Sequence, residues 1–197
     1  MPVHDRPLTP AARRVLQVAG ELFYERGIGS VGMELIAAEA GVTKKTVYDR
    51  FGSKNALILA YLRARDERWR AFLTGRIAGA AETRERILAT FDALGEWLTT
   101  ECGRGCSMVN ACAELPDPAH PVHGVAAEQK AWIRALYAGL VGDGVLADQL
   151  LILHEGAVVA FSVAGLRDAA ASARAAAEAL VPGGSAPPAP EHTDQTA

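Results

Sequence analysis

Apolar residues recur at intervals of three and four along nearly the whole chain, and glycine and proline residues interrupt this pattern. No run of β-branched residues alternates apolar and polar side chains at every second position. The first spacing gathers apolar side chains on one face of an α-helix, whereas a half-buried strand needs the second. The sequence therefore predicts an all-α fold.

Capping residues, glycine and proline mark where each predicted helix begins and ends. Thr9 followed by Pro10 is typical of a helix start, and Gly27, Gly41 and Gly52 are typical of helix ends. The expected helices lie at about 10–26, 33–40, 44–51, 54–74, 83–101, 106–114, from the proline-rich turn at 116–121 to 140, 147–166 and 168–180. The charged run 63–68 is expected to form a solvated face, and the polar end 182–197 is expected to be disordered.

The composition limits the class of protein. Half of the 197 residues are hydrophobic, and the net charge is −3. Residues 1–54 carry a net charge of +2 and the remainder carries −5. This asymmetry fits a protein that touches nucleic acid with one end, although ordinary scatter of surface charge explains it equally well.

Targeting and redox signals are absent from the sequence. The first seven residues contain no apolar core of a secretory signal. The apolar stretch 145–166 is interrupted by Asp148, His154 and Glu155, which leaves too short an uncharged run to cross a bilayer, since crossing takes about 20 residues. Three cysteines, an odd number, suggest no disulfide framework. These features predict a cytoplasmic chain with no membrane partner.

The stretch 33–51 has the pattern of two short helices joined by a tight turn. Gly41 can adopt the left-handed conformation that ends the first helix, and Thr43 can cap the second by accepting a backbone hydrogen bond. Val42 and Val47 stand at the two positions of a hydrophobic staple, which fixes the angle between the helices. The pattern predicts a helix-turn-helix.

The second of these helices is expected to have an inner and an outer face. At about 100° per residue, Val47 and Phe51 lie together and face the core, with Lys45 and Asp49 opposite them. Lys44 and Lys45 occupy the first turn, where the helix macrodipole disfavours cations. A phosphate backbone favours them there, because helices that bind DNA lead with their N-terminal residues.

Four stretches of sequence together resemble the signature of the tetracycline-repressor (TetR) family. They are GIG at 27–29, IAAEAGV at 36–42, TKKTVYDRF at 43–51 and SKNAL at 53–57, within about the first third of the chain. The resemblance implies an N-terminal three-helix DNA-binding domain at 9–54, with its helix-turn-helix at about 33–51. It also implies a C-terminal helical domain for effector binding and dimerisation at 55–181, followed by the disordered tail 182–197.

Carried over position by position, the resemblance implies a set of residues that contact DNA. They are Thr43, Lys44, Lys45, Thr46, Tyr48, Arg50 and Lys54. Tyr48 and Lys54 match phosphate ligands of the family. Gly32 replaces the usual Ser or Thr cap of the first short helix, and Arg50 replaces a usual His or aromatic residue and could add a phosphate contact. Asp49 either accepts from a cytosine amino group or pairs with Lys45 one turn back.

The resemblance also implies a homodimer, because two modules related by a twofold axis read a palindrome. Helix 147–166 is the candidate dimer surface, since small residues at spacing four and apolar bulk lie along it. The predicted interface residues are Leu150, Gly156, Val158, Ala160, Phe161 and Ala164. The alternative is an ordinary core helix within one subunit.

A small, apolar effector between the middle helices is a further implication of the resemblance. The candidate pocket residues are Phe91, Trp97, Met108, Asn110, Cys112, Trp132, Tyr137 and His154. Aromatic and methionine residues at helical spacing belong more often to a core than to a pocket, so a structural role is the alternative for each. Asn110 stands apart, because a polar residue in an apolar helix needs a hydrogen-bond partner.

Other functions compete with this interpretation. Cys102, Cys106 and Cys112 suggest a metal- or thiol-responsive regulator, although no CxxC pair or structural zinc spacing is present. The sequence contains no P-loop, nucleophile elbow, GxGxxG or HExxH motif, so we predict neither an enzyme nor a cofactor. A helical interaction protein without DNA binding is the last alternative. We predict a repressor that a small molecule releases from palindromic operator DNA.

Overall fold

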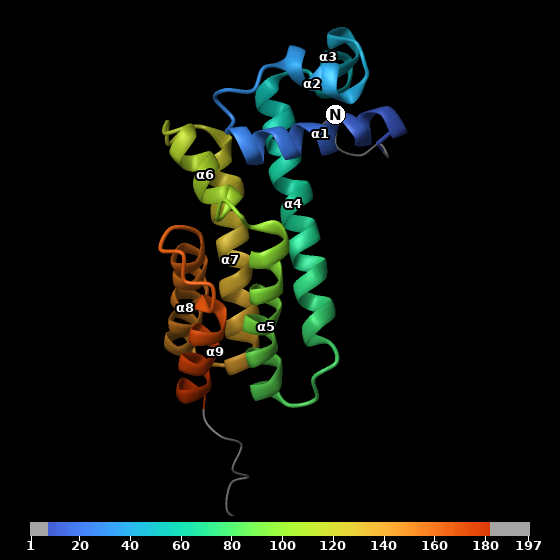
Figure 1. Ribbon diagram of the computed structural model, residues 1–197. Helices are drawn as coiled ribbons and strands as arrows, with labels where there is room; N and C mark the ends of the chain where they lie inside the picture. The colour runs from blue at the N-terminus through green and yellow to red at the C-terminus, as the bar shows by residue number, and fades with distance from the viewer. Residues whose placement is uncertain (1–7, 182–197) are drawn as a thin grey trace, which may run out of the picture.

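The computed structural model describes residues 8–181, and within that range it contains helices and no strands (Figure 1). The predicted all-α fold is confirmed. The predicted disordered tail, 182–197, lies outside the described residues. The helices are α1 (Pro10–Arg26), α2 (Met33–Ala40), α3 (Lys44–Phe51), α4 (Lys54–Ile77), α5 (Thr83–Glu101), α6 (Ser107–Glu114), α7 (Pro121–Val141), α8 (Gly144–Ser162) and α9 (Ala169–Leu180).

The N-terminal helices begin at the capping residues that the sequence predicts. The side chain of Thr9 accepts from the backbone N–H of the third residue beyond it, and Thr43 and Ser53 do the same at the starts of α3 and α4. Gly41 ends α2 with φ of 68°, a left-handed conformation that glycine adopts without steric cost. Local hydrogen bonds therefore fix these helix boundaries.

Two predicted boundaries are wrong, and in both cases local structure explains the difference. Helix α4 runs to Ile77 instead of 74, because Leu73 and Ile77 extend its buried stripe. Helix α8 spans Gly144–Ser162 instead of 147–166. The carboxylate of Asp143 accepts from two backbone N–H groups and starts the helix early, and Gly165, with φ of 71°, reverses the chain after it.

The helices form two parts, joined by the long α4 (Figure 1). Helices α1 to α3 lie at one end, with α1 crossing α4. The second half of α4 packs with α5 and α7, and α8 and α9 lie on the side of the bundle away from α4. Each part has its own cluster of buried apolar residues. The N-terminal cluster extends past residue 54, because the first turns of α4, the short α6 and the start of α7 pack into it.

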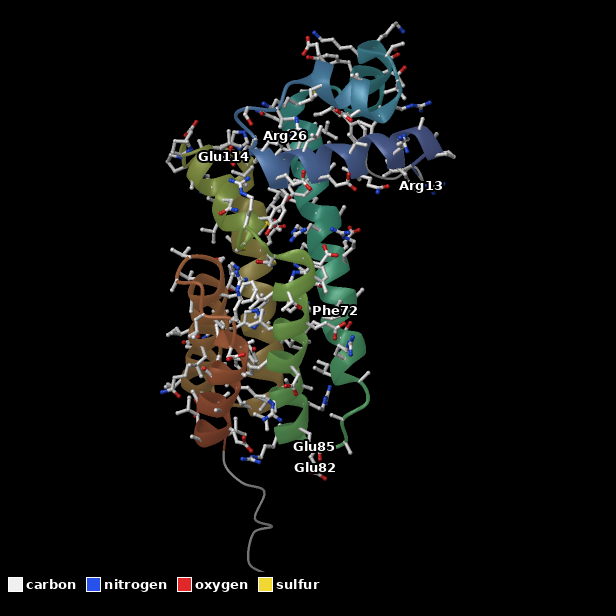
Figure 2. All side chains as sticks on the ribbon, in the orientation of Figure 1. Arg13, Arg26, Phe72, Glu82, Glu85 and Glu114 are labelled. Atoms are coloured by element: carbon white, nitrogen blue, oxygen red, sulfur yellow. The ribbon has the colours of Figure 1, made fainter. Side chains whose placement is uncertain are left out.

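Helix α6 connects the bundle to the N-terminal helices. A carboxylate oxygen of Glu114, at the end of α6, accepts from the backbone N–H of Gly29 at 2.9 Å. Figure 2 shows Glu114 beside the end of α1 that carries Arg26. A displacement of α6 therefore reaches the loop between α1 and α2 directly.

Helix α8 is the one helix within residues 8–181 that is long and apolar enough to cross a bilayer by length and composition alone. About a third of it, 33%, is buried inside the subunit, where it packs against α7 and α9. The core helix of a soluble protein meets the same criterion.

Candidate functional site

The helix-turn-helix is built from α2 and α3, which meet at the turn between Gly41 and Thr43. The Val47 side chain of α3 is fully buried and packs in the same apolar cluster as Ala37 and Ala40 of α2. The small side chains of α2 let the two helices approach closely. Because the Val47 side of α3 is buried against the core, the opposite side faces outward. This outer side lies at the end of the molecule farthest from the bundle (Figure 1).

The first turn of α3 presents two exposed lysines, and each already has a carboxylate partner. The Lys44 ammonium forms an ion pair with Glu34 of α2 and lies 5.8 Å from the Tyr48 ring centre. The Lys45 ammonium pairs with Asp49 at 3.0 Å, and its side chain is 84% exposed. The structure thus contains the Lys45–Asp49 pair, one of the two alternatives for Asp49. Both pairs are open to water, so their ammonium groups can exchange partners at small cost.

The remaining predicted DNA contacts surround this turn. Tyr48 and Arg50 are exposed, and the Thr43 and Thr46 hydroxyl groups lie 2.9 Å apart. Lys54 is half-buried, and its ammonium donates to the carbonyl oxygen of Ile28 at 2.6 Å. This bond holds the α1–α2 loop against the start of α4.

Gly32 is the N-cap of α2 and contributes no side-chain hydrogen bond. The first backbone N–H groups of α2 therefore lack the side-chain acceptor that Ser or Thr would supply.

A second feature lies in the bundle, where α4, α5, α6, α7 and α8 line a cavity of about 40 Å³ that is partly open to solvent. One wall is aromatic: the rings of Trp69 and Trp97 lie with their centres 5.2 Å apart, and both line the cavity. The rest of the wall is mixed, with charged residues of both signs beside apolar residues such as Leu94, Met108 and Ile133.

The charged donors in this wall are paired within the subunit. The Lys130 ammonium donates to both carboxylate oxygens of Glu155 at 2.8 Å and lies 3.5 Å from the Cys106 sulfur. The guanidinium of Arg65, which is only 8% exposed, donates to the Glu101 carbonyl oxygen and lies 3.6 Å from both the Glu101 carboxylate and the Cys102 sulfur. The net charge of the wall is therefore compensated from inside.

A buried hydrogen-bonded chain ends at the cavity. Thr90 Oγ1 donates to the carbonyl oxygen of Ile87 at 2.6 Å, lies 3.0 Å from the Tyr137 hydroxyl, and that hydroxyl lies 3.1 Å from His154 Nδ1. Because the Thr90 proton is used by Ile87, Thr90 accepts from Tyr137, and Tyr137 in turn accepts from a proton on His154 Nδ1. The chain thus favours a neutral His154 with Nε2 as an acceptor.

Burial controls the protonation of this chain. Desolvation, and secondarily the Lys130 charge, lower the pKa of His154 from its ordinary 6.5 to about 3. Burial also raises the pKa of the Tyr137 hydroxyl far above its usual range. At neutral pH both groups are uncharged and act only as hydrogen-bond donors and acceptors.

The cavity wall also contacts α1 through Tyr24. The Arg65 guanidinium, which lines the cavity, lies 4.4 Å from the centre of the Tyr24 ring. The Tyr24 hydroxyl donates to the Gly105 carbonyl and accepts from the Arg104 N–H, both at 2.9 Å, and its burial raises the Tyr24 pKa to about 12. The loop between α5 and α6 is thereby tied to the N-terminal helices.

Comparison with known proteins agrees with this arrangement. Residues 15–61 match the N-terminal domain of the bacterial regulatory proteins of the tetR family. A crystallised TetR-family transcriptional regulator from Streptomyces coelicolor is 31% identical and superimposes with a TM-score of 0.81, over 87% of this chain and 88% of that one. The chain belongs to the TetR family. Its N-terminal part is therefore the helix-turn-helix domain of a family of DNA-binding transcriptional regulators.

Two curated relatives match parts of this TetR-family protein. An uncharacterised HTH-type transcriptional regulator of Mycobacterium tuberculosis is 35% identical over 46% of this chain and 50% of its own length. The HTH-type transcriptional regulator YjdC of Escherichia coli K12 is 30% identical over 59% of this chain and 61% of its own. The chain thus spans about half to three fifths of the length of these relatives.

The structure separates the residues predicted for the effector pocket into two groups. Trp97, Met108 and His154 line the cavity. Phe91 and Tyr137 are fully buried and lie beside His154, with ring centres 6.4 and 6.2 Å from it in tilted and edge-on geometry.

The other three predicted pocket residues lie outside the cavity wall. Cys112 packs against the N-terminal cluster, and Trp132 lies under the Arg70 guanidinium at 4.8 Å. Asn110 finds the partner that its polarity requires in the backbone, where its amide donates to the Arg104 carbonyl at 2.9 Å. The polar side chain of Asn110 therefore stabilises a local turn.

The residues predicted for the dimer interface also differ in their burial. Leu150, Val158 and Phe161 are buried in the subunit's own core, so they support α8 from inside and cannot face a partner. Gly156 is exposed and Ala160 is half-buried on α8, whereas Ala164 lies beyond the end of the helix.

The apolar side of α8 that is exposed carries other residues. Val145, Ile152 and Val159 follow one another at intervals of seven residues and are 68%, 69% and 57% exposed. This spacing places them in one line along the helix. The sequence pattern missed them because α8 is apolar on nearly every side, so that periodicity does not distinguish an inner face from an outer one.

Sequence reasoning also missed the polar residues of the cavity. Arg65 lies in the run 63–68, which was wrongly expected to be solvated throughout. It stands four residues from both Tyr61 and Trp69 on the buried stripe of α4, just as Gln129 stands four residues from Val125 and Ile133 on the buried stripe of α7. A polar residue at a core position of a helical stripe was the available signal.

The three cysteines are free thiols. Burial raises the pKa of the Cys102 and Cys112 thiols, which lowers their reactivity. Within residues 8–181 no group of three or more His, Cys, Asp or Glu side chains could hold a metal ion.

Proposed function

We propose that this TetR-family protein is a homodimeric, cytoplasmic repressor that binds palindromic operator DNA and leaves it when a small molecule occupies the bundle cavity. The main support is the first turn of α3. Two exposed lysines lie there, and the buried Val47 holds the opposite side of the helix against the core. Such a helix can enter a major groove with its N-terminal residues first. Thr43 and Thr46 would lie near bases, with Tyr48, Arg50 and Lys54 on flanking phosphates.

The exposed apolar line on α8 supports the dimer. Three large aliphatic side chains in a row on one helix face form the type of surface that soluble proteins cover with a partner. A second copy of the chain related by a twofold axis would bring the same line against itself. Gly156, between Ile152 and Val159, would allow the two α8 helices to approach closely.

Contacts between the cavity wall and α1 support the effector response. Arg65 lines the cavity and also contacts the Tyr24 ring of α1. A ligand that moves this guanidinium therefore changes how α1 packs against the bundle. Two recognition helices must stand roughly 34–36 Å apart to engage consecutive turns of DNA. A shift of a few ångströms between the two heads would therefore prevent simultaneous engagement. The charged cavity wall favours a polar effector over the apolar one expected from the sequence.

A gel-shift assay with the DNA that flanks the chain's own gene tests the proposal. The wild type should form a discrete complex that excess nonspecific competitor DNA does not displace. The Lys44→Ala/Lys45→Ala double variant should bind at least tenfold more weakly at low salt, because each lost phosphate contact removes about one counterion-release step. Its plot of log affinity against log salt should become shallower by up to about two.

The matched control is Arg76→Ala/Arg84→Ala, which removes the exposed Arg76 cation and the half-buried Arg84 cation at the opposite end of the molecule. Figure 2 shows Glu82 and Glu85, which flank Arg84, far from α3. This control should bind like the wild type. An equal loss of DNA affinity in both double variants would mean that binding depends on net charge alone and not on contacts made by α3.

A further inference from the structure

Hydrogen-bond acceptors in the bundle cavity have no partner in the subunit. Oε1 of Gln129 and Oδ1 of Asp66 are both buried without a hydrogen-bond partner in the described chain, and both residues line the cavity. The Gln129 residue is only 8% exposed. Buried polar atoms are nearly always paired, because an unpaired one destabilises the fold. These two acceptors therefore point to a donor among the cavity's contents.

The cationic side chains of the wall do not supply that donor. All three N–H groups of Lys130 have partners in Glu155 and Cys106, and Arg65 is held by Glu101 and Cys102. The charged donors of the wall are therefore occupied, while Gln129 Oε1 and Asp66 Oδ1 are free.

His154 contributes an acceptor nitrogen to the same wall. The chain from Ile87 through Thr90 and Tyr137 puts the His154 proton on Nδ1, which leaves Nε2 with a lone pair. His154 lines the cavity as well.

We propose that the cavity binds a small planar organic cation of the amidinium or guanidinium class, which donates N–H groups to Gln129 and Asp66. This inference rests on the proposed function, since it names the chemistry of the effector. The carboxylate of Asp66 pairs with Arg70 through Oδ2 at 2.6 Å, and its Oδ1 has no partner. That oxygen and the faces of Trp69 and Trp97 favour a positive charge. The volume of about 40 Å³ compares with the 10–15 Å³ that one water needs, so three or four heavy atoms fit.

Acetamidinium and acetate form the decisive pair of probes, because they share size and planar shape but have opposite hydrogen-bonding capacity. Trp69 and Trp97 in the wall report occupancy through tryptophan fluorescence. Acetamidinium is expected to give a saturable change with the full-length chain, and acetate at the same ionic strength is expected to give none. A saturable change with acetate as well, or with neither probe, overturns the inference.

Substitution of Gln129 tests the same site from the protein side. Gln129→Met keeps the side-chain length and removes the unpaired acceptor, so the variant should fold and melt at the same or a higher temperature. It should bind acetamidinium about tenfold more weakly or worse, since a hydrogen bond from a charged donor is lost. The control Gln17→Met, at an exposed position on α1, should bind like the wild type. Unchanged affinity in Gln129→Met overturns the assignment.

A separate gel shift distinguishes this inference from the proposed function. If the chain binds its operator and acetamidinium gives no fluorescence change, the ligand class is wrong and the DNA-binding function stands. If acetamidinium binds with the expected dependence on Gln129 and no operator complex forms, the cavity assignment stands and the proposed function fails.

Discussion

Replacing Ile152 and Val159 together by aspartate is expected to convert the dimer to monomers and to weaken operator binding at least a hundredfold. Both side chains are exposed on the apolar line of α8, so the change creates no cavity in the subunit. In a dimer it would place four unpaired carboxylates in a desolvated interface, which is costly. Joining two DNA-binding domains typically raises the affinity for DNA by a factor of about 10² to 10⁴, and monomers lose that gain.

Sedimentation at micromolar concentration measures the first part of this prediction, and fluorescence anisotropy with operator DNA measures the second. The matched control is Val109→Asp, which changes an exposed valine on α6 that lies off the α8 line. It should remain dimeric and bind DNA normally. A double variant that sediments as a dimer would show that α8 does not form the interface.

The helix boundaries were predictable because the signals that set them are local. Thr9, Thr43 and Ser53 cap helices by bonding to a backbone N–H three residues away, and Gly41 ends α2 through its own conformation. Such interactions are written in a few consecutive residues. Helix α3 was predictable for the same reason, since its buried valine and exposed lysines lie within one turn of each other.

The cavity was not predictable because its contacts join residues far apart in the chain. Lys130 and Glu155 are 25 residues apart, and Tyr137 meets Thr90 across 47. Which of several polar residues turns inward depends on how the helices rotate against each other. Arg65 illustrates the difficulty, because its neighbours Arg63 and Arg68 are exposed while it is buried.

The stability of the fold is expected to fall in acid, with His154 as a principal cause. Its pKa lies near 3 in the folded chain and at about 6.5 when unfolded, so the unfolded state binds the proton more readily. The resulting contribution is complete above pH 6.5 and is lost progressively as the pH falls toward 3. Within this window the slope is about 1.4 kcal/mol per pH unit, and the whole effect is of the order of 5 kcal/mol.

Urea unfolding at pH 7.5, 6.0 and 4.5, at one fixed protein concentration, measures this dependence. His154→Phe removes the titrating group and keeps an aromatic ring against Trp69, so its free energy of unfolding should fall less steeply with acid than that of the wild type. Phe91→Leu is the matched control, because it disturbs the same core without changing a titratable group. This control should be less stable at every pH yet parallel to the wild type. If His154→Phe also runs parallel to the wild type, the pKa of His154 must be the same in the folded and the unfolded chain, and burial would not keep this side chain neutral.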